Sequence, residues 1–86
     1  MVGKKPEKKP FGRDGPPRGY PKDQSQYAGP ENWRYPLHTH WHARAARRYF
    51  DEWSNRGKYT EEERAYIDWR IDQALKKYEK ETSSAK

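Results

Sequence analysis

Two stretches in the second half of the chain alternate apolar and polar residues with a helical period. Over residues 40–53 the apolar positions fall within about 180° of a helical projection at about 100° per residue. Thr39 precedes this stretch and is a suitable N-cap. We therefore predict a helix over about 40–53. Its buried side should consist of Trp41, Ala45, Ala46, Tyr49, Phe50 and Trp53.

The second stretch opens with a helix-start signal. Thr60 followed by Glu63 three residues later is a capping box, in which each side chain satisfies an amide at the helix start. The helix should run over about 60–78, and Gly57 in the preceding turn favours an antiparallel hairpin. Its apolar stripe consists of Ile67, Ile71, Ala74, Leu75 and Tyr78.

A short extended segment precedes the first helix. Trp33, Tyr35 and Leu37 alternate with polar residues, and Pro36 restricts its predecessor to extended backbone. The pattern predicts a brace across the two helices. We therefore expect an all-α fold, an antiparallel two-helix hairpin with an extended Pro/aromatic brace, over residues 31–78, followed by a polar tail at 79–86.

The first 30 residues differ in composition from the rest. They hold six of the seven prolines and five of the six glycines, and seven basic against three acidic residues leave them with a net charge of +4 out of +6. Such a segment buries too little apolar surface to offset its chain entropy. We expect residues 1–30 to form a basic arm that is disordered or is ordered by a partner.

The overall composition excludes several classes of protein. Only 30% of the residues are hydrophobic and 37% are charged, so an ordinary aliphatic core and a membrane span are excluded. The chain has no cysteine, which excludes disulfides and thiolate chemistry. Its start lacks the apolar stretch of a secretory signal. We expect a cytoplasmic protein without membrane association.

Neither catalysis nor metal binding is favoured. His38, His40 and His42 alternate as in a metal-binding tract, but a helix that starts near His40 turns the second and third imidazoles apart. His42 falls within the apolar arc, so we prefer a packed, hydrogen-bonded His42 to a metal site. The chain contains no phosphate-binding loop, nucleophile elbow or zinc-protease motif. We expect no catalytic residues, no cofactor and no enzyme activity.

The basic residues favour a polyanionic partner. Guanidinium groups on one helical face match phosphates well, and arm cations supply long-range attraction. The alternative is internal pairing, with Arg47 facing Asp51 and Arg48 facing Glu52 at i,i+4 spacing. We predict contacts with DNA or RNA phosphates, without sequence specificity, from Lys4, Lys5, Lys8, Lys9, Arg13, Arg18, Arg44, Arg47 and Arg48.

Several aromatic residues are candidate anchors for a protein partner. Trp69 lies on the side of the second helix opposite its apolar stripe, where Tyr66 is near it. Either the arm or the brace covers this side, or Trp69 is an interface residue, since Trp and Tyr are enriched in binding hot spots. The predicted partner-binding residues are Phe11, Tyr20, Tyr27, Tyr66 and Trp69.

The sequence also resembles a small helical domain of unknown function. That family typically reads YADPEN-x-x-YP-[LI], and this chain reads YAGPENWRYPL over residues 27–37, departing at Gly29. The similarity continues to Tyr78 through His42, Arg44-Ala45-Ala46, Lys58-Tyr59, Glu62-Glu63-Arg64, Tyr66-Ile67 and Arg70-Ile71. The resemblance implies a helical hairpin fronted by an extended proline segment. The family occurs in phage head and prohead-protease regions and in small proteins of thermophilic archaea, with no agreed activity.

These observations lead to two hypotheses about function. The first is a small basic accessory subunit that docks on a larger nucleic-acid-handling complex, by analogy an archaeal B-family DNA polymerase holoenzyme or a ribosome, and contacts phosphates. The second is a structural protein–protein adaptor, such as a virion component, whose charge serves solubility.

Overall fold

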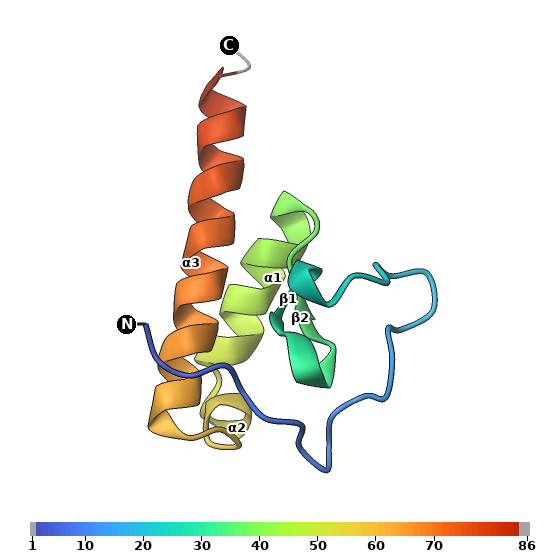
Figure 1. Cartoon of the computed structure of the whole chain (residues 1–86). Coiled ribbons are helices and arrows are strands. Elements are labelled where there is room, and N and C mark those ends of the chain that lie inside the picture. Colours follow the sequence, from blue (N-terminus) through green and yellow to red (C-terminus); the bar gives the residue numbers. More distant parts are fainter. Residues whose placement is uncertain (1, 85–86) are drawn as a thin grey trace.

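The computed structural model describes residues 2–84, and side chains as far as residue 81. In chain order its elements are the 3-10 helix η1 (Gln24–Gln26), strand β1 (Tyr27–Gly29), the 3-10 helix η2 (Pro30–Asn32), strand β2 (Arg34–Pro36), and helices α1 (His40–Asp51), α2 (Trp53–Arg56) and α3 (Glu61–Ser84). Figure 1 shows α1 beside α3, with α2 at the base and the small sheet against α1.

The fold is mixed, and the expectation of an all-α two-helix hairpin is wrong. β1 and β2 pair as antiparallel strands, with Tyr27 opposite Pro36 and Gly29 opposite Arg34. η2 connects them and ends at Trp33, whose φ of 52° is left-handed. Only the second strand was recognisable as extended, because the first is three residues long and lies next to the Pro/Gly-rich segment. Tyr27 and Ala28 are nevertheless fully buried, which accounts for the pairing.

Both predicted helix starts are confirmed. The Thr39 hydroxyl accepts a hydrogen bond from the His42 amide at 3.0 Å. In the capping box, the Glu63 amide donates to the Thr60 hydroxyl at 3.2 Å, and the Thr60 amide donates to Glu63 Oε1 at 2.9 Å. α3 continues to Ser84, past the predicted end at Tyr78, because the residues after Tyr78 include no Gly or Pro to stop it.

The core lies between α1, α3 and the sheet. Phe50, Ile67 and Ile71 are fully buried, together with Ala28, Tyr35, Leu37, Ala43, Ala46 and Tyr59 at 7% exposure or less. The predicted buried side of the first helix is partly wrong, since Trp41, Tyr49 and Trp53 are 57%, 55% and 67% exposed. Ala43, Ala46 and Phe50 join the core instead, because a single neighbouring helix and a small sheet cannot cover an arc as wide as this one.

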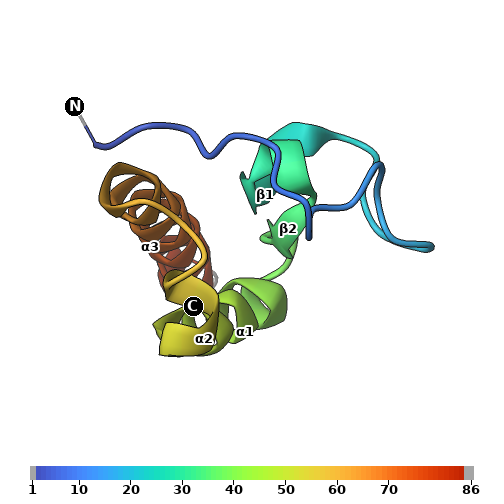
Figure 2. The ribbon, with the colours of Figure 1, turned by 90° about the horizontal axis from the view of Figure 1, so that it is seen from below.

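The N-terminal arm packs on its own chain. Pro6 is buried, the Lys4 amide donates to the Glu62 carbonyl at 3.0 Å, and the Lys9 amide donates to Asn32 Oδ1 at 2.7 Å. Seen from below, this segment crosses α3 and lies on the opposite side of the sheet from α1 (Figure 2). The expectation of a disordered or partner-ordered arm is therefore wrong for these residues, since Asn32 and the start of α3 supply their polar partners.

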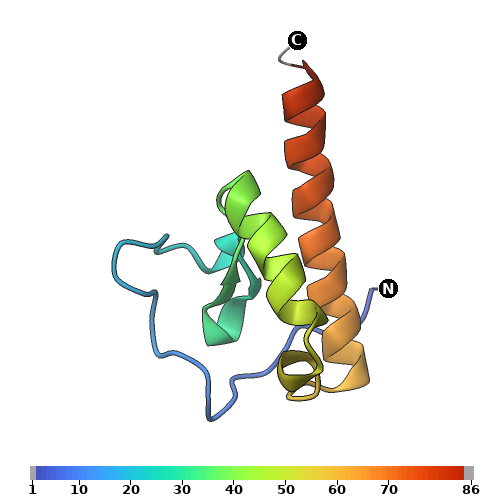
Figure 3. The same cartoon turned by 180° about the vertical axis from the view of Figure 1, so that it is seen from behind.

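α3 extends past the rest of the fold at its C-terminal end, as the view from behind shows (Figure 3). Near this end the rings of Tyr78 and His40 of α1 stack, with centroids 5.7 Å apart. The Tyr78 hydroxyl also donates to the Leu37 carbonyl at 2.7 Å. A search of the described residues for a helix long and apolar enough to cross a membrane finds none.

Candidate functional site

A groove of about 430 Å³ opens between the arm, β2 and the outer side of α1. Aromatic, proline and arginine side chains dominate its lining, and no carboxylate is among them. The lining residues are Arg13, Pro17, Tyr20, Arg34, Tyr35, Pro36, Trp41, His42, Ala45, Ala46, Tyr49 and Asn55. Such a site favours an occupant that is anionic and carries flat apolar groups.

Ring contacts position the wall that the arm contributes to the groove. Tyr20 contacts His38 and His42 edge-on, with centroid distances of 5.6 and 5.5 Å. The two imidazoles lie 4.2 Å apart, and Trp41 meets His42 edge-on at 5.0 Å. Burial, and then the nearby His42, lower the pKa of His38 below its ordinary value, which favours the neutral form of His38.

The histidines are therefore divided between two structural roles. His38 and His42 hold Tyr20, whereas His40 stacks on Tyr78 of α3. In the part of the chain that the structure describes, no group of three or more His, Cys, Asp or Glu side chains is placed to hold a metal ion. The expectation that His42 is packed and hydrogen-bonded agrees with its ring contacts and with the 2.6 Å contact between its Nδ1 and the Thr39 hydroxyl.

Four arginines line or flank the groove without an ion pair among the described residues. Arg13 donates to the Trp33 carbonyl at 2.8 Å, and Arg34 donates to the Phe11 carbonyl at 3.2 Å. Carbonyl oxygens fix these two guanidinium groups in place without neutralising their charge. Arg44 and Arg48 are exposed on α1, within about 60° of Trp41 around the helix at 100° per residue.

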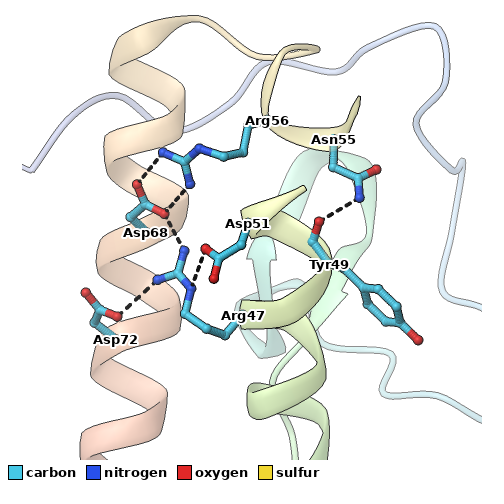
Figure 4. Close-up of polar contacts among 7 residues, drawn as sticks. All are labelled: Arg47, Tyr49, Asp51, Asn55, Arg56, Asp68 and Asp72. Carbon is cyan, nitrogen blue, oxygen red and sulfur yellow. Dashed lines mark hydrogen bonds and ion pairs between the residues drawn. The ribbon is translucent and has the colours of Figure 1, made fainter. Parts of the chain in front are cut away.

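Arg47, in contrast, belongs to an internal ion-pair network. It contacts Asp51 at 3.1 Å, Asp68 at 2.6 Å and Asp72 at 3.2 Å, while Arg56 makes a two-pronged contact with Asp68 at 2.9 Å for both nitrogens. Figure 4 shows both guanidinium groups converging on α3. The internal pairing of Arg47 with Asp51, which was the alternative to phosphate contact, is therefore formed. Burial alone would raise the pKa of Asp68, but hydrogen bonds from Arg56 and Arg47 outweigh it and hold that pKa below its ordinary value.

We expect Asp68→Asn to lower the free energy of unfolding by about 1–2 kcal/mol, because it removes the charge that both arginines share. Asp72→Asn is the matched control, since Asp72 is 55% exposed and contacts Arg47 once. It should cost no more than about 0.5 kcal/mol. Urea denaturation of both variants measures the difference, and equal losses would contradict the central place of Asp68.

The arm lysines lie away from the groove. Lys9 contacts the buried Glu63 at 2.8 Å, while Lys4 pairs with Glu7 at 3.6 Å and Lys8 with Asp14 at 3.4 Å at the surface. Lys5 and Arg18 are exposed. The predicted cations therefore do not form one surface: Lys4 and Lys9 lie against the start of α3, whereas Arg13 lines the groove.

The predicted partner-binding rings also differ in their surroundings. Tyr27 is fully buried and donates to the Pro21 carbonyl at 2.8 Å, and Phe11 packs edge-on against Tyr59 at 5.6 Å. Tyr66 and Trp69 lie 6.0 Å apart on α3. The arm reaches α3 near Ala65, next to Tyr66, yet leaves Trp69 37% exposed.

Sequence reasoning missed Trp41, Tyr49 and Arg34 as candidate site residues. The available signal was the width of the apolar arc, since two-helix packing buries a narrower stripe and leaves the bulky rings at its edge exposed. Tyr49 illustrates this: its ring points away from α3 in Figure 4, while its carbonyl accepts from Asn55 at 2.7 Å. Arg34 gave no signal, because its place depends on the unpredicted sheet.

Comparison with known proteins adds one match. A family model described as a family of unknown function (DUF6582) matches residues 14–85. No curated protein matches the chain, and no solved structure does. The match is consistent with a small domain of unknown function, and it carries no phage or archaeal affiliation.

Proposed function

The chain belongs to DUF6582, a family of unknown function, and we propose that it is a non-enzymatic accessory protein that contacts nucleic-acid phosphates. The observation that carries the proposal is the contrast between arginines of the same region. Arg47 and Arg56 are neutralised by aspartates, whereas Arg13, Arg34, Arg44 and Arg48 surround a groove that has no carboxylate lining. An uncompensated cationic surface of this kind attracts polyanions.

Docking on a larger complex is the second part of the proposal. Trp69 is exposed beside Tyr66 on α3, and a large ring on an otherwise polar helix face is a typical anchor for a protein partner. A subunit bound through α3 would leave the α1 side free to face nucleic acid. An archaeal DNA polymerase holoenzyme and a ribosome are candidate hosts, because each presents nucleic acid beside protein.

We expect Arg44→Ala combined with Arg48→Ala to weaken binding of a labelled DNA or RNA oligonucleotide about tenfold at about 50 mM salt. The slope of log K against the logarithm of salt concentration should become shallower by the amount expected for the loss of about two phosphate contacts. Lys76→Ala combined with Lys77→Ala is the control, since it removes the same charge from α3. Fluorescence anisotropy at two salt concentrations measures both effects. Equal losses of affinity in the two double variants would contradict a defined binding surface around α1 and would show that net charge alone determines the binding.

The alternative is a structural protein–protein adaptor, and the exposure of Trp69 is also what that function requires. The same titration separates the two functions. Absence of binding to any oligonucleotide at low salt would favour the adaptor, in which the arginines serve solubility.

A further inference from the structure

We infer that the groove binds single-stranded nucleic acid, whose unpaired bases stack on Trp41 and Tyr49 while its phosphates follow the arginines. This inference rests on the proposed function and names the ligand class of the same surface. The phosphates of a duplex would meet the charge of Arg44 and Arg48 equally well. The exposed rings of Trp41 and Tyr49 are the feature that favours a single strand over a duplex.

The two rings lie on one side of α1 and line the groove. Trp41 and Tyr49 are eight residues apart, which places them about 12 Å apart along the axis, the rise of three to four stacked nucleotides. They are 57% and 55% exposed. Trp41 is supported by the edge-on contact with His42, and the Asn55 side chain binds the Tyr49 carbonyl at the end of the helix. The Trp41 ring is therefore held by a neighbouring side chain, whereas at Tyr49 the backbone is fixed and the ring remains exposed.

An unpaired base is the group that fits this arrangement. A base in a duplex offers only its edge to a protein, whereas an unpaired base can also place its face against the exposed Trp41 and Tyr49 rings that line this groove of about 430 Å³. Base–aromatic stacking requires no particular sequence, because every base has a π face. Such binding agrees with the prediction of contacts without sequence specificity.

The charge of the site favours a polyanion over a peptide. Arg13 and Arg34 line the groove, Arg44 and Arg48 flank it, and its lining holds no carboxylate. An aromatic groove also accepts a proline-rich peptide, but a peptide backbone carries no charge for four arginines to meet. Stacked bases joined by phosphates supply both complements along one strand.

Fluorescence anisotropy measures the affinity of the protein for four labelled probes of about twelve nucleotides. The probes are single-stranded DNA, single-stranded RNA of the same sequence, an abasic strand with the same phosphates, and the DNA duplex. We expect the two single strands to bind within about threefold of each other, because they share base faces. Each should bind at least about tenfold more tightly than the abasic strand.

Two substitutions assign the difference to the rings. Trp41→Ala combined with Tyr49→Ala should reduce single-strand affinity to the level of the abasic strand and leave abasic and duplex affinity unchanged, and each single variant should cause part of this loss. Trp69→Ala on α3 is the control and should leave all four affinities unchanged. Circular dichroism at the assay temperature verifies that each variant is folded.

The outcomes distinguish this inference from the proposed function. Equal affinity for the single-stranded and abasic probes, or tighter binding of the duplex, overturns base stacking while the phosphate-contacting function survives. Failure of every probe to bind at low salt overturns both. A proline-rich acidic peptide could also displace the bound strand at a lower concentration than unlabelled strand does. That result would overturn the single-strand inference, because the groove would then be a peptide site.

Discussion

Glu63→Ala is expected to lower the free energy of unfolding by about 3–5 kcal/mol, a large share of the stability of a domain this small. The carboxylate is 1% exposed and accepts from the amides of Thr60 and Glu7 and from Lys9 Nζ, at 2.9, 3.0 and 3.0 Å. Alanine leaves the Lys9 ammonium largely buried without its partner and removes the side-chain contacts of Glu63 with the arm, so that the bond from the Lys4 amide to the Glu62 carbonyl remains. Urea denaturation at pH 7 measures the loss.

Two further variants isolate the cause. Glu63→Gln retains an acceptor oxygen and the side-chain shape but loses the charge, so its cost should lie between that of alanine and zero. Glu62→Gln is the exposed control, because the arm binds the Glu62 carbonyl rather than its side chain. It should cost less than about 0.5 kcal/mol. A Glu62→Gln loss as large as that of Glu63→Ala would show that general charge at the helix start dominates.

The same carboxylate gives the stability a pH dependence with a defined sign. Burial alone would raise the pKa of Glu63, but the hydrogen bonds from Lys9, Thr60 and Glu7 lower it from 4.5 to about 2. Because the folded pKa is depressed, the contribution is complete above about pH 4.5 and is lost as the pH falls toward 2, on the order of 3 kcal/mol in all. Glu63→Gln should therefore show a shallower loss of stability over this range.

Local signals in the sequence predicted the helix starts because each depends on residues three positions apart. The Thr39 cap and the Thr60–Glu63 capping box need no tertiary information. The second role of Glu63, as the partner of Lys9, joins residues 54 positions apart and leaves no local trace. The arm was misjudged for this reason: its composition argues for disorder, while single polar groups on distant elements hold it.

The sequence indicated some of the residue types of the candidate site but not their arrangement, and binding of a polyanion stays a prediction. Basic residues interleaved with rings indicated polyanion contact, and Arg44 and Arg48 do flank the groove. Arg47 is adjacent to Arg48 in sequence yet faces three aspartates, since a step of about 100° turns it toward α3. The choice between these neighbours requires the position of the second helix, which periodicity alone does not give.

Adjacent rings on α1 provide the most direct test of which side of that helix is the core. Phe50 is fully buried, 5.5 Å from Tyr35 and 5.8 Å from Tyr59 between ring centroids. Phe50→Ala should cost about 3–5 kcal/mol, because it leaves a cavity among rings that cannot collapse onto alanine. Tyr49→Ala is its matched partner and should change stability by no more than about 0.5 kcal/mol, since the ring is exposed and only its carbonyl meets Asn55. Thermal and urea unfolding measure the loss of stability in each of the two variants. A large loss for Tyr49→Ala would place that ring in the core and remove it from the stacking surface.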